Sequence, residues 1–129
     1  MSRTALVIDD DRKAQRTFRS MFWRLGWAEP TMVMLGEEAL AILRTECATF
    51  DVIILDQGLP VMKGLDFLAA ARQRNYELPP VIMITGDYGS TVEPRAKELG
   101  VACFFMKNKL SESKLKEALA EVLNTDTEP

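Results

Sequence analysis

Short apolar runs alternate with amphipathic stretches along the chain, and this alternation constrains the fold more than any other feature of the sequence. The runs are four to six residues long and rich in valine and isoleucine, and they cover 5–8, 32–35, 52–55, 81–84 and 101–106. Uninterrupted apolar runs of this length are typical of strands that are buried on both faces, as in a parallel sheet. Because helical patterns alternate with the runs, the sequence predicts an α/β fold with helices on both faces of the sheet.

The stretches between the runs show apolar stripes at helical spacing. The first stripe consists of Ala14, Phe18, Met21, Phe22 and Leu25, and the others fall within 39–47, 65–72 and 115–122. Asp11 and Ser111 are expected to cap the first and the last helix. Pro94 interrupts the weakest stretch, 91–99, and proline is tolerated only in the first turn of a helix. We therefore expect a short helix there, beginning near Glu93 or Pro94 and ending at 99–100.

Length and composition fit one soluble domain. The chain has 129 residues, of which 47% are hydrophobic and 27% are charged, as in ordinary globular domains. Its longest apolar run, 101–106, is far shorter than the ~20 residues of a membrane-spanning helix, and no signal peptide opens the chain. We expect a cytoplasmic protein without a membrane partner.

Charge and the lack of histidine exclude several classes of function. The formal net charge of −3 argues against direct nucleic-acid binding. The chain contains no histidine, which excludes histidine general bases, Ser-His-Asp triads and histidine metal sites. The two cysteines, Cys47 and Cys103, form no C-x-x-C pair and are expected to be reduced and buried.

Polar and charged residues follow the predicted strands. They are Asp9, Asp10 and Asp11 after the first run, Asp56 after the third, Thr85 after the fourth and Lys107 after the fifth. In open parallel sheets, sites form at the carboxyl ends of the strands. We therefore expect these side chains to meet at one edge of the sheet.

Such a cluster has a definite chemistry. Asp9, Asp10 and Asp56 would raise each other's pKa unless a cation neutralised them, and Mg²⁺ binds one or two carboxylates together with water. A phosphoryl group would meet the metal, the ammonium of Lys107 and the hydroxyl of Thr85, which are the electrostatic parts of phosphoryl transfer. Asp56 stands alone at the end of a central strand and is the best candidate for a nucleophile that forms an acyl phosphate.

Each of these residues also has a simpler interpretation when it is taken alone. Asp11 fits a helix cap, a lysine at a strand end is usually solvated, and Thr-Gly is usually a turn. The order and spacing of the whole set favour the functional interpretation.

The set resembles the receiver domain of two-component response regulators, over the chain from Ala5 to about Leu123. The resemblance rests on Asp9-Asp10, on Thr85, on Lys107 and on the segment 56–64, Asp-Gln-Gly-Leu-Pro-Val-Met-Lys-Gly, which looks like the family's D-x-x-x-P-x-x-x-G loop. It implies a flavodoxin-like (βα)5 sandwich of three layers with strand order 2-1-3-4-5. The receiver domain would span 1–123, and 124–129 would form a polar tail or the start of a linker.

The resemblance also implies roles for single residues. Asp56 would accept a phosphoryl group from a phosphohistidine. Asp10, Asp56 and the backbone carbonyl of Gly58 would bind Mg²⁺ or Mn²⁺ directly, whereas Asp9 would act mainly through water.

Three further residues would respond to the phosphoryl group. Thr85 and Lys107 would hold its oxygens, and Thr85 and Phe104 would form the switch. The implied partner is a sensor histidine kinase or a histidine phosphotransferase. The resemblance is also compatible with a homodimer that forms on phosphorylation. No enzymatic activity is expected beyond phosphorylation and dephosphorylation of the domain itself.

The chain departs from the family pattern at two positions. Asn108 follows Lys107, where the family usually has a proline that is often joined by a cis peptide bond. A cis bond before a non-proline residue costs ~3 kcal/mol, so we expect a trans bond and a rearranged loop. Pro94 shortens the helix that usually belongs to the output face.

Three other functions can be compared with the residues of this chain. A flavodoxin needs a phosphate-binding loop after the first strand, where three aspartates would repel a flavin phosphate. Aspartate-based phosphatases place a second acid two residues after the nucleophile, where this chain has Gly58. A receiver-like interaction module that is not phosphorylated remains the alternative, although the acidic pair, the acceptor and the lysine are all present.

The first helical stretch has an unusual charge pattern. Between positions 12 and 28 it carries five basic residues and no acidic residue. A solvated helix face is the simpler interpretation, and a docking surface is the functional one. Trp23 and Trp27 flank the end of this helix. Trp23 lies off the apolar stripe and could serve as an exposed anchor, although a tryptophan packed over a helix end is commoner.

Overall fold

A single parallel sheet forms the middle layer of the computed structural model, which describes residues 3–46, 49–86, 89 and 91–124. Cys47 and the residues of the expected tail from 125 onward lie outside the described residues. The strand order is β2-β1-β3-β4-β5, as the resemblance implies. The strands are β1 (Ala5–Ile8), β2 (Thr31–Val33), β3 (Val52–Leu55), β4 (Val81–Thr85) and β5 (Cys103–Met106).

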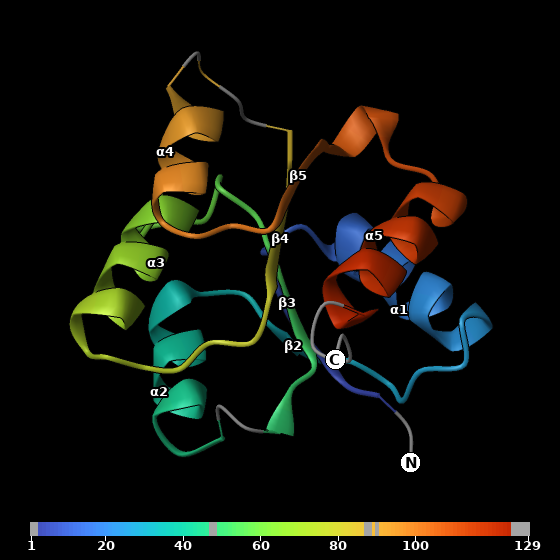
Figure 1. Ribbon diagram of the computed structural model, residues 1–129, viewed down its shortest axis with the longest axis horizontal. Coiled ribbons are helices and arrows are strands. Elements are labelled where there is room, and N and C mark those ends of the chain that lie inside the picture. Colours follow the sequence, from blue (N-terminus) through green and yellow to red (C-terminus); the bar gives the residue numbers. More distant parts are fainter. Residues whose placement is uncertain (1–2, 47–48, 87–88, 90, 125–129) are drawn as a thin grey trace.

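Five helices cover the two faces of the sheet, which Figure 1 shows nearly edge-on. One face carries α1 and α5, and the other carries α2, α3 and α4. Their bounds are α1 (Arg12–Arg24), α2 (Gly36–Glu46), α3 (Gly64–Gln73), α4 (Val92–Glu98) and α5 (Glu112–Asn124). A 3-10 turn, η2 (Lys107–Lys109), connects β5 to α5. None of the helices in the described part of the chain has the length and apolarity needed to cross a membrane.

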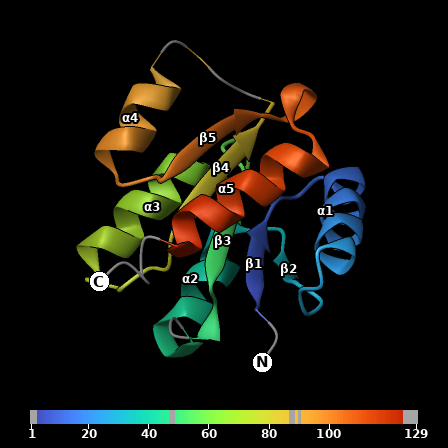
Figure 2. The same ribbon diagram turned by 45° about the vertical axis from the view of Figure 1, so that its right-hand side comes forward.

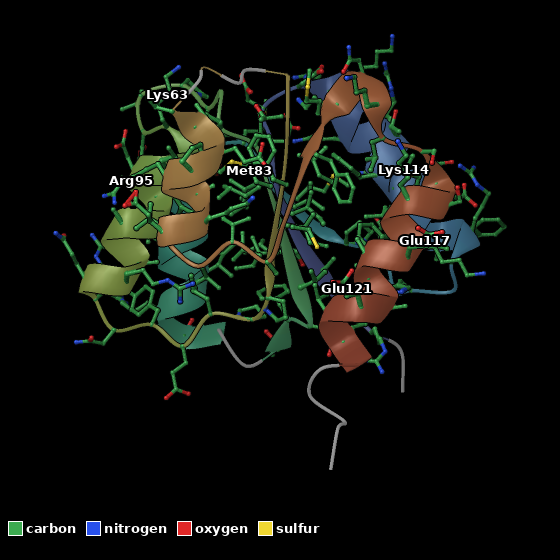
Figure 3. All side chains as sticks on the ribbon, turned by 45° about the horizontal axis from the view of Figure 1, so that its top comes forward. Lys63, Met83, Arg95, Lys114, Glu117 and Glu121 are labelled. Carbon is green, nitrogen blue, oxygen red and sulfur yellow. The ribbon has the colours of Figure 1, made fainter. Side chains whose placement is uncertain are left out.

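The apolar runs are continuous because both faces of the central strands are buried. In β1, Leu6 and Ile8 belong to the core under α2, α3 and α4, whereas Ala5 and Val7 belong to the core under α1 and α5. Figure 3 shows Met83 of β4 in the interior of the molecule, whereas Glu117 and Glu121 lie along the outer side of α5. The two cores fix the register of the strands, since a shift by one residue would exchange their faces.

Most helix boundaries follow the sequence signals. The side chain of Asp11 accepts a hydrogen bond from the amide of Lys13 at 3.1 Å, and Ser111 Oγ accepts one from the amide of Lys114 at 3.2 Å. Both expected caps are therefore confirmed. Pro94 lies in the first turn of α4, where its missing amide hydrogen costs no intrahelical hydrogen bond.

Two strands and one cysteine differ from expectation. The second strand ends at Val33, because the amides of Met34 and Leu35 turn to donate hydrogen bonds to Glu38 Oε1, at 3.3 and 3.2 Å, in front of α2. The last strand begins only at Cys103. The expectation of a buried thiol at Cys103 is wrong, since that residue is only partly buried.

Candidate functional site

Asp9, directly after β1, carries a buried carboxylate, and three hydrogen bonds hold the residue in place. Asp9 is 1% exposed, and its Oδ1 accepts a hydrogen bond from the amide of Asp11 at 2.9 Å. Its own amide donates to the carbonyl of Val33 at 3.1 Å. Gln15, on the first turns of α1, donates from Nε2 to the carbonyl oxygen of Asp9 at 2.7 Å. These hydrogen bonds fix the backbone at the end of the strand.

Asp56 lies at the end of β3, between β1 and β4. It is 5% exposed, and its amide donates to the carbonyl of Ile8 at 3.0 Å. The loop that follows is closed by Gln57, whose carbonyl accepts from the amide of Gly64 at 3.0 Å and whose Oε1 accepts from the amide of Leu65 at 2.8 Å. The loop therefore returns directly beside the acceptor and begins α3 there.

Gly64 explains why the loop motif ends in glycine. A Cβ atom at this position would collide with the backbone carbonyl oxygen of Asp56 and would lie 2.9 Å from Cα of Gln57. Backbone atoms cannot move aside as a flexible side chain can. The glycine therefore allows a close approach that sets the position of Asp56.

Lys107, directly after β5, reaches across this edge of the sheet. Its Nζ lies 2.9 Å from Oδ2 of Asp9 and 3.7 Å from Oδ2 of Asp56. The described residues contain no cis peptide bond, which confirms the trans bond expected between Lys107 and Asn108. The chain then forms the turn η2. That this loop is rearranged relative to the family's loop stays a prediction.

Burial and charge oppose each other in this cluster. Burial raises the pKa of Asp9 above the ordinary 3.8, and the hydrogen bonds from Lys107 and from the amide of Asp11 only partly compensate. Burial works to lower the pKa of Lys107, but the hydrogen bond with Asp9 and the charge of Asp56 outweigh it, so the pKa is raised. The Lys107 side chain is therefore protonated, and its ammonium lies close to the carboxylates of both Asp9 and Asp56.

The site fits a hard divalent cation. Carboxylate oxygens of Asp9, Asp10 and Asp56 all lie within 4.8 Å of one another. Apart from its ion pair with Lys107, the buried Oδ2 of Asp9 accepts no hydrogen bond from the described residues. Three carboxylates face one ammonium, so a cation with oxygen ligands would remove the remaining repulsion.

The two expected switch residues, Thr85 and Phe104, lie in surroundings that differ from each other. Thr85 is fully buried at the end of β4 and pairs with Met106 in the sheet register. Phe104 is partly buried against the core under α2, α3 and α4. It also lines a groove of about 780 Å³, together with residues of α4, its neighbours Phe105 and Met106 in β5, and Lys114. Phe104 thus lies between the core and the surface groove, whereas the carboxylates meet at the carboxyl ends of the strands.

The sequence did not reveal Gln15 and Gln57. Both act on backbone groups, at the carbonyl of Asp9 and the amide of Leu65. A glutamine carries no charge signal, and its partners lie six and eight residues away, which is beyond any helix or turn spacing. Only the folded loop brings these groups together.

The fold and the acidic site together define a phosphoryl-accepting signalling domain of the two-component type. The model of the response regulator receiver domain matches residues 5–120, so the chain belongs to this family. The flavodoxin-like fold that the resemblance implies is confirmed.

Relatives support the assignment over nearly the whole chain. A chemotaxis protein CheY homolog of Campylobacter jejuni is 32% identical over 121 residues, which cover 93% of this chain and 92% of that protein. The solved structure of chemotaxis protein CheY4 of Vibrio cholerae is 28% identical with a TM-score of 0.79, covering 95% and 100% of the two chains. A receiver domain structure from Clostridium thermocellum, at 23% identity and a TM-score of 0.84 over 97% of each chain, shares the fold.

Proposed function

We propose that Asp56 accepts a phosphoryl group from a phosphohistidine of a sensor kinase or a histidine phosphotransferase. The observation that carries the proposal is the position of Lys107 Nζ between Asp9 and Asp56, at 2.9 and 3.7 Å. In the transfer, the N–P bond of the donor breaks and an O–P bond to an Asp56 carboxylate oxygen forms. The imidazole leaves neutral, because its other nitrogen keeps a proton.

The surrounding residues would divide the work of binding. Asp10, Asp56 and the carbonyl of Gly58 would hold Mg²⁺ or Mn²⁺, with Asp9 acting through water. The bound ion would supply positive charge to the phosphoryl oxygens. Lys107 would neutralise a further oxygen.

The response to phosphorylation would pass through β4 and β5. Thr85 would bind a phosphoryl oxygen, and Phe104 would change rotamer in the same transition. The chain would catalyse only its own phosphorylation and dephosphorylation. The receiver domain would extend over 1–123, since Val122 is buried and Leu123 packs against the same core.

The experiment is phosphorylation by acetyl phosphate, followed by intact mass. With Mg²⁺ the protein should gain one phosphoryl group, about 80 Da, and the chelator EDTA should prevent the gain. Asp56→Asn should abolish it, whereas Asp66→Asn, at an exposed carboxylate in the first turn of α3, should not. Full labelling of the Asp56→Asn protein would refute the proposed acceptor.

The metal ligands have a separate test. Asp10→Ala should weaken Mg²⁺ binding, measured by calorimetry on the unphosphorylated protein, because one of the clustered carboxylates is lost. Asp11→Ala is the matched control, since Asp11 caps α1 and is not part of the cluster. Equal Mg²⁺ affinity of the Asp10→Ala protein and the parent would contradict the proposed ligand set.

A further inference from the structure

One face of α1 is basic along its whole length. Arg12, Arg16, Arg19 and Trp23 follow one another at spacings of four, three and four residues, which places them on the same side of the helix. All four are exposed, and the opposite side of α1 is buried against the sheet. Figure 2 shows α1 at the border of the molecule, beside β2 and with its far side open. The stripe is therefore a free surface of the protein.

Trp23 is the most unusual member of this stripe. Its exposed fraction is 79%, and it belongs to neither core. Trp27 behaves differently, because its ring packs on Phe22 with the ring centres 5.1 Å apart. A tryptophan this exposed loses the hydrophobic stabilisation that burial would give it. Trp23 contributes little to the fold and is available for a contact with another molecule.

The exposed ring borders a groove. The groove has a volume of about 350 Å³ and is lined by Arg16, Arg19, Ser20, Trp23, Trp27 and Glu29. Arg24 borders the groove, since its Nη1 donates a hydrogen bond to Ser20 Oγ at 2.9 Å, and the same guanidinium contacts Glu112 of α5 at 2.6 Å. The groove thus combines an apolar wall with two guanidinium groups.

The basic residues of the groove and of the helical turn that precedes it are only loosely paired with carboxylates. Arg19 has a loose and exposed ion pair with Glu29 at 3.6 Å. Among the described residues, no carboxylate lies within ion-pair distance of Arg12, Lys13 or Arg16. This positive face stands out in a chain whose formal net charge is −3. The charge complementarity therefore favours a negatively charged occupant.

Trp23, at the far end of the groove, is remote from the proposed phosphorylation site. α1 begins directly after Asp9, Asp10 and Asp11, and Trp23 follows Arg12 by eleven residues. At a rise of 1.5 Å per residue, this is about 16 Å along the helix axis. An occupant that packs on Trp23 therefore does not need to touch Asp56.

We propose that this groove, Arg16, Arg19, Trp23 and Trp27, binds an acidic segment of a partner protein that packs an apolar side chain on Trp23. A peptide fits better than a nucleic acid, because the basic groups form one helix face that Glu29 borders, without the wider basic surface that nucleic acids need. It also fits better than a lipid surface, because the stripe offers only one exposed apolar side chain for insertion. The proposal does not rest on phosphoryl transfer to Asp56.

The test is a selection of randomised 12-residue peptides by phage display. Peptides that bind the Arg16→Ser/Arg19→Ser/Trp23→Ser protein are removed first, and the parent protein then selects from the remainder. We expect enriched peptides that combine Asp or Glu with a large apolar residue. Failure to enrich any peptide, or enrichment of peptides without excess acidic residues, would overturn the proposal.

Single variants then locate the contact. Fluorescence anisotropy of an enriched peptide should show binding weakened about 30-fold by Trp23→Ser, as for a central aromatic anchor, and much less by Trp23→Phe. Arg16→Ser should weaken binding and reduce its dependence on salt. Arg74→Ser, at an exposed arginine after α3, should change nothing. Tighter binding of single-stranded DNA or of phosphatidylserine vesicles through these residues would also refute the proposal.

Discussion

The ammonium nitrogen of Lys107 lies closer to Asp9 than to Asp56, at 2.9 Å against 3.7 Å. The lysine is therefore directed mainly at the buried neighbour of the proposed acceptor. A phosphoryl group on Asp56 would bring new anionic oxygens within its reach. Since only differential interaction can shift a conformational equilibrium, we expect the exchange of partners by Lys107 to link phosphorylation to structural change.

Lys107→Ala tests this link. Asp56 should still be phosphorylated by acetyl phosphate, but the population of the switched state should fall about tenfold or more, because a charge-assisted hydrogen bond contributes about 1.5–3 kcal/mol. The measurement is the phosphorylation-induced NMR shift of the Phe104 ring. Lys109→Ala changes a neighbouring exposed lysine of η2 and should leave the shift intact. A full shift in the Lys107→Ala protein would contradict the coupling.

Asp9→Asn should stabilise the protein when no metal is bound. Burial raises the pKa of Asp9 above 3.8, so the folded state binds this proton more tightly than the unfolded state does. The resulting stability is complete below pH 3.8 and is lost as the pH rises through the folded pKa. Above the folded pKa the buried charge is therefore a penalty, and its replacement by a neutral amide should raise the free energy of unfolding.

The pH dependence distinguishes this cause from general effects of the substitution. Urea unfolding in EDTA should show that the advantage of Asp9→Asn is largest near pH 7 and shrinks as the pH falls through the raised pKa. Asp66→Asn, at an exposed position, serves as the control. An Asp9→Asn protein that is less stable than the parent at every pH would show that the ion pair with Lys107 outweighs burial.

Gly64→Ala should damage both stability and the site. The new methyl group would meet the backbone of Asp56 and Gln57, and such overpacking costs about 1–3 kcal/mol. We expect a lower free energy of unfolding and slower phosphorylation by acetyl phosphate, because the acceptor must shift. Gly86→Ala is the matched control, since a Cβ there would meet no atom within 4 Å. Equal effects of the two substitutions would exclude close approach as the reason for Gly64.

The parallel sheet and the meeting of the carboxylates could be predicted because both follow from alternation along the chain, whereas the strand order was implied by the resemblance to receiver domains. The runs before Asp9 and Asp56 are buried on both faces. Parallel strands bring these carboxylates and Lys107, which follows the edge strand β5, to one edge of the sheet. The alternation along the chain does not indicate where the second strand ends. That end depends on Glu38, which captures the amides of Met34 and Leu35 in competition with the sheet.

Solvent exposure was harder to predict than position. The pattern placed Trp23 off the apolar stripe but could not decide between an exposed ring and a ring packed over the helix end. The decision depends on the α1–β2 connection, in which Trp27 takes the place beside Phe22 and leaves Trp23 outside. Likewise, Cys103 lies in an apolar run, yet β5 is an edge strand, so its side chains are only partly buried.

The last prediction concerns how long the acyl phosphate survives. Gly58, two residues after Asp56, is partly exposed and has no side chain to cover a phosphoryl group. In-line attack by water needs an open path opposite the leaving carboxylate oxygen. We therefore expect the phosphorylated protein to decay in about minutes rather than many hours.

A larger polar side chain at this position should obstruct that path. Gly58→Gln should lengthen the lifetime, whereas Gly58→Ala, which adds one methyl group, should have a smaller effect. The measurement is the loss of about 80 Da over time after acetyl phosphate is removed, with Mg²⁺ kept constant. A lifetime of a day for the parent, or faster decay of Gly58→Gln, would mean that a group other than residue 58 controls the approach of water to the acyl phosphate.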